Sequence, residues 1–440
     1  MFVRNKKELE SIMSSHLCNR CGSCVGLSDG AIEFKDREGK YQPHFVGDIS
    51  SENLDRVLKS CTGKYFDFPK YKEEVYPEAS YFHTYSGAYE SISIGYAQDQ
   101  EIRSLGASGG VISAVLVYLL EKKRIDGAVV LRMSPEKPWL SEPFIATTRE
   151  EILDAAQSKY TISSVNEILS QTAHFDGRLA YVGIPPQVQS IRKLQSINDP
   201  SVRNIDYIFG PFYGNTLHFS SVVSFLKSYH IKDFHSISKL YFRYGEWPGN
   251  MRVETTDGQV AELKKFHANY LIPFHILKNS LYCTDLANEY TDISGGDAWA
   301  PVYEDRGLGF SMIIGRSKKG QDLLEEMKRE GYLSYNEIEE DEAIGMHSHG
   351  YDLKKRGSFI RIKFRKMLGK SVPDYGYQLS GFGFKRTAME VIISSMFAIL
   401  STPLARWIVE QFSPTFIGNM FEKSRNIWKK STHDIKRKEL

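Results

Sequence analysis

The sequence predicts an α/β fold with some α+β elements, and three observations support this prediction. Between about residues 101 and 330, apolar runs of strand length alternate with helix-like periodic segments, which is typical of α/β architecture. The first 75 residues carry four of the five cysteines, and the region beyond about residue 336 has acidic and basic stretches of its own. We therefore expect a cysteine-bearing module at 1–75, an α/β domain at 76–335 and a helical, basic extension at 336–440.

The amino-acid composition and charge argue against several classes of function. With 440 residues, 41% of them hydrophobic and 25% charged, the chain can bury the cores of two or three domains. The net charge of +2 gives no general attraction to nucleic acid, and basic residues cluster only beyond residue 350. The N-terminus has no apolar signal core, so we expect a cytoplasmic protein with reduced cysteines.

The cysteine spacing is the most specific signal. Cys18, Cys21 and Cys24 form a C-x-x-C-x-x-C run, whose thiolates can surround one iron–sulfur cube. Cys61 is the candidate for the fourth ligand. Two alternatives remain open at this point: zinc also binds three or four cysteines, with His16 as a further candidate ligand, and buried thiols can hold no metal at all. Disulfides are not expected, because the number of cysteines is odd and three of them are crowded together.

The first α/β unit begins with a glycine- and serine-rich loop at 104–110. In residues 111–123, apolar side chains recur at helical spacing and predict a helix with one buried face, followed by a strand at 125–131. A loop of this kind at a helix N-terminus leaves N–H groups free to bind phosphate. It matches no established phosphate-binding motif, so a glycine-rich turn packed closely on a neighbouring helix is an equal alternative.

Further elements follow in order along the chain. We expect strands at 178–183, 205–209 and 309–316, a helix at 188–195 and a hairpin at 240–262, whereas 76–100 resembles a linker. In open α/β sheets, ligands gather where strands end in loops. Asp292 and Asp297 lie among glycines and are candidates for binding a metal or a ribose, although solvated loop acids are more common.

Taken in order, these segments resemble the coenzyme F-420 (deazaflavin) hydrogenase/dehydrogenase beta-subunit family, whose relatives include 7-hydroxymethyl chlorophyll a reductase. The similarity runs from about residue 14 to 335 and depends on the order and spacing of its motifs. These motifs are the cysteine run, Ser108-Gly109-Gly110, Gln157-Ser158-Lys159-Tyr160, the segments 182–187 and 210–214, and Asp292-Ile293-Ser294-Gly295-Gly296-Asp297.

The resemblance implies an iron–sulfur flavoprotein. It implies a [4Fe–4S] cluster on the four N-terminal cysteines and FAD beside it, with coenzyme F-420 as a further cofactor to consider. The implied cofactor-binding residues are Ser108, Gly109, Gly110, Ser158, Lys159, Tyr160, Gly183 and Asp297. Lys159 is the implied catalytic residue, because a lysine near a flavin stabilises its reduced, anionic form; a surface lysine on a helix is the alternative.

Two departures from the family pattern concern cysteines. Many relatives have cysteine where this chain has Pro186, and many have a C-x-x-C pair where Ser280 precedes Cys283. A second cluster therefore lacks ligands. Cys283 is left as a vestige, a buried thiol or a substitute fourth ligand for the one cluster.

The implied function is an oxidoreductase that passes electrons between the cluster, FAD and a redox partner. Flavin suits this role because it accepts electrons in pairs and releases them singly. The partner is expected to be ferredoxin, reduced deazaflavin or a small molecule. The alternative is a non-catalytic cluster-binding subunit for electron transfer or assembly, acting with a partner subunit, and a third reading is a zinc-stapled binding module.

The C-terminal region lies outside the resemblance. Residues 391–405 are uncharged and interrupted by Pro403, and a membrane-spanning helix needs about 20 apolar residues, so this run is too short to cross a bilayer. With Trp407, Trp428 and the basic tail, the segment 385–440 could contact an anionic membrane surface peripherally, at the inner face. The alternative is an amphipathic helix packed on the core or on a partner subunit.

Overall fold

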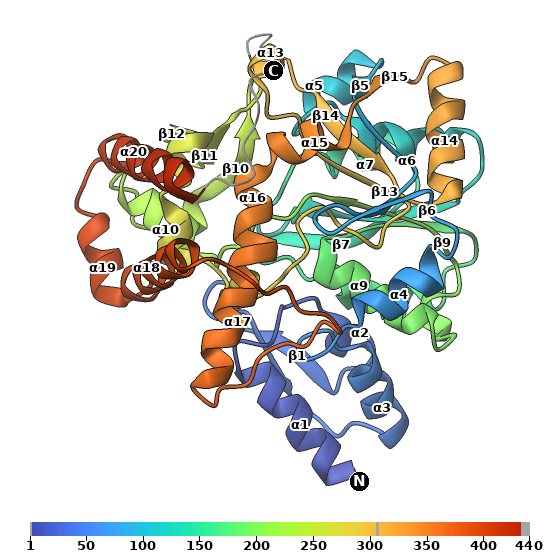
Figure 1. Cartoon of the computed structure of the whole chain (residues 1–440), viewed down its shortest axis with the longest axis horizontal. Helices are drawn as coiled ribbons and strands as arrows, with labels where there is room; N and C mark the ends of the chain where they lie inside the picture. Colours follow the sequence, from blue (N-terminus) through green and yellow to red (C-terminus); the bar gives the residue numbers. More distant parts are fainter. Residues whose placement is uncertain (1, 305–307, 433–440) are drawn as a thin grey trace.

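An eight-stranded mixed sheet forms the centre of the computed structural model, which describes residues 2–304 and 308–432 (Figure 1). Four parallel strands lie side by side in the middle, and antiparallel strands extend the sheet on both sides. This arrangement confirms the predicted α/β class with α+β elements. In spatial order the strands are β15 (Leu333–Glu337), β5 (Ser91–Ala97), β14 (Ser311–Gly315), β13 (Ile293–Asp297), β9 (Ile205–Pro211), β8 (Leu179–Val182), β6 (Gly127–Met133) and β7 (Ser141–Ala146).

Helices cover both faces of this sheet. On one face, α6 (Val111–Glu121) and α14 (Lys318–Arg329) share a core with Ala128, Val130 and Ala180. On the other face, α9 (Pro185–Gln195) packs with Val129 and Tyr181. Side chains of successive strand residues thus alternate between two cores, as the pleat requires. The predicted helix at 111–123 and the predicted strands at 125–131 and 205–209 are confirmed to within a few residues.

The N-terminal residues do not form a core of their own. Leu54, Val57 and Phe66 belong to the same apolar cluster as Val188 and Ile191 of α9. This segment comprises α1 (Phe2–Ser14), α2 (Ser23–Gly26), the antiparallel pair β1 (Ile32–Lys35) and β2 (Gln42–Phe45), α3 (Ser51–Ser60) and α4 (Phe68–Val75). The cysteine-bearing segment is therefore fixed against the sheet on the α9 side.

The interpretation of 76–100 as a linker is wrong for residues 91–97. After the short hairpin β3 (Tyr81–His83) and β4 (Gly87–Tyr89), the chain enters β5, which lies inside the main sheet between β15 and β14. The serines that made this segment look polar are buried: Ser93 is 1% exposed, and Ser91 pairs through its Oγ with Gln321. Small hydroxyl side chains can be buried in a strand that is covered on both faces. Because serine counts as polar on hydropathy scales, the sequence pattern does not reveal such a strand.

A second, three-stranded antiparallel sheet extends the predicted hairpin at 240–262. Its strands β10 (Ile237–Tyr244), β11 (Asn250–Thr255) and β12 (Val260–Lys264) share one core with helices from two distant parts of the chain. Those helices lie beside the small sheet at the left of Figure 1. They are α10 (Ser220–Lys227), α11 (Lys265–Ala268), α12 (Leu271–His275), α18 (Phe384–Leu400), α19 (Pro403–Val409) and α20 (Pro414–Thr432).

The segment between the two sheets contains buried ion pairs. After α15 (Glu340–Met346) and α16 (Ser348–Tyr351), a π-helical turn at Asp352–Gly357 leads into α17 (Ser358–Met367). Lys355 pairs with Glu289 at 2.5 Å, and Arg386 of α18 pairs with Asp352 at 2.8 Å. The stretch that the sequence marks as strongly basic is therefore partly an internal set of paired charges, since a buried charge needs a partner.

Smaller elements complete the described chain. Residues 374–377 return to the N-terminal segment, where Phe66 N–H donates to the Asp374 carbonyl and Phe68 N–H to the Tyr375 carbonyl, both at 3.0 Å. Within residues 2–304 and 308–432, no single helix is long and apolar enough to cross a membrane; α18 and α19 meet that test only as a pair bent by 81°. The remaining short helices are α5 (Gln100–Leu105), α7 (Arg149–Asp154), α8 (Leu169–Thr172) and α13 (Pro301–Glu304).

A buried histidine predicts a pH dependence of stability. His275 in α12 is 1% exposed, and its Nδ1 lies 2.9 Å from Ser220 Oγ. Burial and the nearby charge of Arg406 lower its pKa to about 3. The unfolded chain protonates this histidine below about pH 6.5 whereas the folded chain does not, so stability falls as the pH falls. We expect the free energy of unfolding to drop by about 2 kcal/mol between pH 7 and pH 5 from this group alone.

Urea unfolding at the two pH values tests this expectation. His275→Gln should have a smaller pH dependence, whereas His230→Gln, at an exposed position, should behave as the wild type. Equal pH dependence in the wild type and in His275→Gln would contradict the assignment.

Candidate functional site

A cavity of about 970 Å³ opens at the C-terminal ends of the parallel strands. The cavity is lined by Val182 at the end of β8, by Gly183 after it, by Pro211 at the end of β9 and by Asp297 at the end of β13. This is the place where open α/β sheets bind ligands. Seven of the eight cofactor-binding residues expected from the sequence lie in the wall: Ser108, Gly110, Ser158, Lys159, Tyr160, Gly183 and Asp297.

The eighth residue, Gly109, is buried behind the loop. Its N–H donates to Ser311 Oγ at 2.9 Å, and a Cβ at this position would lie 2.6 Å from the Gly95 carbonyl oxygen of β5. The absence of a side chain therefore allows the loop to lie directly against β5 and β14 of the sheet. Ser108, one residue earlier, meets the same Ser311 hydroxyl at 2.8 Å.

The loop ends at Gly110, which sets the start of α6. Gly110 has φ +75°, and a Cβ there would lie 2.8 Å from the Ile102 carbonyl oxygen. No side chain caps this helix, so its first N–H groups stand at the cavity wall without a side-chain acceptor. Such a helix N-terminus favours an anionic group in the cavity.

An ion pair that the sequence did not predict supports the cavity wall: Asp297 lines the cavity, and its partner Arg243 is buried behind it. Arg243 of β10 donates to both carboxylate oxygens of Asp297, with Nη2 2.7 Å from Oδ1 and Nη1 3.3 Å from Oδ2. Its Nη2 also donates to the Ala107 carbonyl at 2.6 Å, and Trp247 Nε1 donates to Asp297 Oδ1 at 2.8 Å. The arginine side chain is only 2% exposed. One guanidinium thus joins the small sheet, the main sheet and the loop before α6.

Two cations also adjust the acidity of the cavity wall. Tyr160 receives a hydrogen bond from Arg243 Nη1 at 3.1 Å, and the Lys265 ammonium lies 5.1 Å from the centre of its ring. Burial opposes ionisation of Tyr160, but the charges of Lys265 and Arg243 outweigh burial and lower the pKa of the phenol. The same two cations lower the pKa of Asp297, again against the effect of burial. This part of the cavity therefore favours negative charge.

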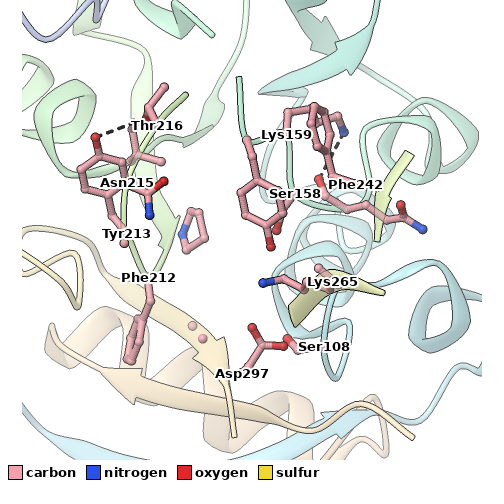
Figure 2. Close-up of a pocket in the computed structure, with 18 of the residues that line it drawn as sticks. Ser108, Ser158, Lys159, Phe212, Tyr213, Asn215, Thr216, Phe242, Lys265 and Asp297 are labelled. Atoms are coloured by element: carbon pink, nitrogen blue, oxygen red, sulfur yellow. Dashed lines mark hydrogen bonds between the residues drawn. The ribbon is translucent and has the colours of Figure 1, made fainter. Parts of the chain in front are cut away.

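Lys159 lies in the cavity wall, and its ammonium is held by hydrogen bonds within the protein. Its Nζ donates to the carbonyls of Ala155, Ala156 and Gln157 at 2.7, 2.7 and 3.3 Å. An ammonium has three N–H donors, so all of them are used within the protein. Burial lowers the pKa of Lys159 to about 7. Figure 2 shows that Lys265, together with Asp297 and Ser108, extends toward the open part of the cavity, opposite Phe212 and Tyr213.

The four N-terminal cysteines converge. Cys61 caps α3, and Asn19 Nδ2, inside the cysteine run, donates to Thr62 Oγ1 at 2.8 Å, which joins the two segments. The pKa of Cys24 is raised well above its usual range by burial and by the proximity of Cys18, Cys21 and Cys61. Burial and the neighbouring Cys21 also raise the pKa of Cys61, to about 12. A second thiolate charge is unfavourable here unless a cation is bound.

Cys283 has other neighbours. It is 3% exposed, its Sγ donates to the Asp285 carbonyl at 3.6 Å, and the positive charges of Lys354 and Lys355 act on it. Within residues 2–304 and 308–432, no three His, Cys, Asp or Glu side chains lie close enough together to hold a single metal ion.

The cysteine run forms part of the cavity wall. Asn19 and Arg20, between Cys18 and Cys21, line the same cavity as the Ser108 loop. Ser164 Oγ donates to the Arg20 carbonyl at 2.8 Å, and Asn166 N–H donates to the Cys21 carbonyl at 3.0 Å. The cysteine run is therefore fixed beside the cavity by these contacts.

Comparison with known proteins identifies the family. Residues 92–170 match the family model for the N-terminal part of the coenzyme F420 hydrogenase/dehydrogenase beta subunit, and residues 176–341 match the model for its C terminus. Together the two matches span more than half of the chain. The chain belongs to this family. The resemblance inferred from the sequence motifs is therefore confirmed, and the chain is a member of a family of oxidoreductase subunits.

Individual relatives agree with this assignment. The coenzyme F420 hydrogenase subunit beta of Methanosarcina barkeri is 29% identical over 264 residues, which are 58% of this chain and 84% of the relative. The coenzyme F420-dependent sulfite reductase of Methanocaldococcus jannaschii is 23% identical over 79% of this chain, and the match spans about half (52%) of that relative. A chain of the F420-reducing [NiFe] hydrogenase complex from M. barkeri has a similar fold, with a TM-score of 0.53 and 24% identity over 66% of this chain and 98% of that chain.

The ion pair predicts a large cost for removing its acid. Asp297→Asn leaves the buried Arg243 without a counter-charge, so we expect the free energy of unfolding to fall by about 3 kcal/mol in urea. Glu254→Gln removes a carboxylate from a partly exposed ion pair with Arg252 in the same small sheet and should cost less than about 1 kcal/mol. Equal losses in the two variants would contradict the central role of the pair.

Proposed function

We propose that this protein is an iron–sulfur flavoprotein oxidoreductase in which electrons pass between a [4Fe–4S] cluster and a flavin. The observation that carries the proposal is the wall shared by the converging cysteines and the cavity. Asn19 and Arg20 belong to both, so a cluster and a cavity-bound cofactor would be immediate neighbours. Membership of a family of redox subunits supports the same conclusion.

The cysteine group fits a cluster. Cys18, Cys21, Cys24 and Cys61 supply the four thiolates that a cube requires, and the cluster would supply single-electron transfer. Lys193 Nζ donates to the Cys61 carbonyl at 2.5 Å, which brings a positive charge close to the sulfur atoms. Nearby hydrogen-bond donors and positive charge are among the factors that set the potential of such clusters.

The cavity fits a flavin, and FAD is the form we propose. The uncapped N-terminus of α6 can bind its phosphates, with Ser108 and Gly110 allowing close approach. Bound there, the flavin would exchange electrons in pairs with a donor or acceptor and singly with the cluster. Lys265 extends into the cavity and can balance negative charge on a reduced ring. Lys159 holds residues 155–157 in the wall, so we assign it a positioning role.

The redox partner follows from the relatives. They are named as coenzyme F420 hydrogenase and F420-dependent enzymes, so we propose deazaflavin as a carrier or further cofactor and ferredoxin as the one-electron alternative. Because the solved relative belongs to a hydrogenase complex, a partner subunit is also part of the proposal. A cytoplasmic setting suits the four thiols, which must stay reduced to bind iron.

One spectrum tests the cofactor content. After anoxic purification, flavin bands over a broad iron–sulfur shoulder, both bleached by dithionite, are the expected result. Cys21→Ser and Cys61→Ser should lose nearly all iron, since each removes a ligand, and Cys283→Ser should retain it. A shoulder without flavin would favour a non-catalytic electron-transfer subunit, and a colourless, zinc-containing protein would overturn the proposal. Iron loss in Cys283→Ser alone would reverse the ligand assignment.

The loop before α6 predicts a separate effect on flavin. Gly110→Ala places a Cβ 2.8 Å from the Ile102 carbonyl oxygen and should reduce flavin occupancy at least about tenfold while iron is retained. Gly331→Ala is the matched control, because Gly331 has a similar φ of +79° but open space around a Cβ. Both variants should lose about 1 kcal/mol of stability from the left-handed backbone. Full flavin occupancy in Gly110→Ala would argue against the loop as the phosphate site.

A further inference from the structure

The C-terminal helices carry a group of exposed large apolar side chains. Ile392 and Ile399 of α18 are 62% and 65% exposed, Leu404 and Trp407 of α19 are 66% and 61%, and Phe416 of α20 is 59%. Single exposed apolar residues are ordinary, but a concentration on three consecutive helices marks an interaction surface. We call the exposed apolar side chains of residues 391–420 the C-terminal apolar surface.

These helices are firmly attached on their other side. In α18, Arg386, Glu390 and Ile393 are buried on one face, whereas Ile392, Ile399 and their neighbours are exposed on the opposite face. Arg386 pairs with Glu390 at 2.8 Å and with Asp352, and Glu390 also pairs with Arg361. In α19 and α20, Val409 and Ile417 belong to the core of the small sheet. The exposed surface is thus a fixed feature of the fold.

Interfaces that relatives share do not account for this surface. The family match ends at residue 341, whereas the surface begins at residue 391. The solved hydrogenase chain is matched over 98% of its length but over only 66% of this chain. A subunit contact common to the family would therefore use other parts of the chain.

The charges around the surface favour an anionic partner. Of the acids in residues 384–426, Glu390 is buried, and Glu410 is 12% exposed and pairs with Lys227; Glu422 lies 3.7 Å from His267. Lys385 and Lys423 are exposed at the two ends of this segment. Apolar side chains, a tryptophan and flanking lysines are the combination that holds amphipathic helices on anionic lipid.

We propose that the C-terminal apolar surface docks on an anionic lipid bilayer, with α18–α20 lying in the interface and not crossing it. Residues 433–440 of the basic tail lie outside the described residues. In α20, Glu422 and Arg425 line the cavity, and they follow Met420 of the exposed surface closely. At helical spacing these two residues lie on the side of α20 opposite Met420, so docking would place the lipid across this one helix from the cavity. If the cavity is the redox site proposed above, a membrane-borne electron carrier would reach it from this side of the molecule.

Co-sedimentation of the full-length, cofactor-loaded protein with vesicles tests the proposal. We expect binding to phosphatidylcholine vesicles that contain phosphatidylglycerol, weakened by salt, and little binding to phosphatidylcholine alone. The double variant Leu404→Ser/Trp407→Ser should bind at least about tenfold more weakly. Tyr81→Ser/Phe82→Ser removes side chains that are 56% and 59% exposed on β3 and should bind as the wild type.

Three results would overturn the proposal. One is the absence of binding to anionic vesicles, and another is unchanged binding by the Leu404→Ser/Trp407→Ser variant. The third is a wild-type dimer in light scattering that becomes a monomer in this variant without any vesicle binding, which would assign the surface to contact between copies. The flavin and iron spectrum of each variant, recorded on the same sample, separates failure of this proposal from failure of the proposed redox function.

Discussion

The buried pair of Arg243 and Asp297 is the interaction on which the cavity depends. The main sheet supplies Asp297 from the end of β13, and the small sheet supplies Arg243 from β10. Neither sheet forms the cavity alone, and the guanidinium also holds the Ala107 carbonyl of the loop before α6. Because both charges are largely buried, each requires the other. The relative position of the two sheets and the shape of the loop are therefore coupled through one side chain.

The cysteine run is also held in place by hydrogen bonds to the α/β domain. Hydrogen bonds from Ser164 and Asn166 hold the backbone at Arg20 and Cys21, and Ser23 Oγ meets Ser190 Oγ of α9 at 2.6 Å. These contacts fix the thiol group relative to the cavity wall rather than leaving it on a separate module. In the proposed redox function, electron transfer between a cluster on these thiols and a cofactor in the cavity would require a fixed separation, which the packing of the N-terminal segment on the sheet provides.

The features that could be predicted from the sequence are those that a short local pattern of residues determines. Helical spacing after Gly110 predicted α6, the family resemblance implied Gly183 and Asp297, which line the cavity, and the cysteine pattern predicted a group of thiols that the structure brings together. Arg243 was missed because nothing near it in the sequence marks it; its importance comes from a strand that pairs with its neighbours and faces a residue 54 positions away. Lys159 was assigned a role from a motif, whereas the end of α7 determines where its ammonium lies.

The C-terminal extension contacts the family region at Ser280 and Cys283, where the cysteine pattern of this chain differs from that of the family. Lys354 is 1% exposed; its Nζ donates to the Ser280 carbonyl at 2.9 Å and lies 4.2 Å from the centre of the Tyr213 ring. Cys283 lies beside the same ammonium. The family resemblance implies a C-x-x-C pair at the place where this chain has Ser280 and Cys283. One thiol beside a buried ammonium lacks the four ligands of a second cluster, so the hydrogen bond from Lys354 to the Ser280 carbonyl joins the C-terminal extension to the family region without a metal.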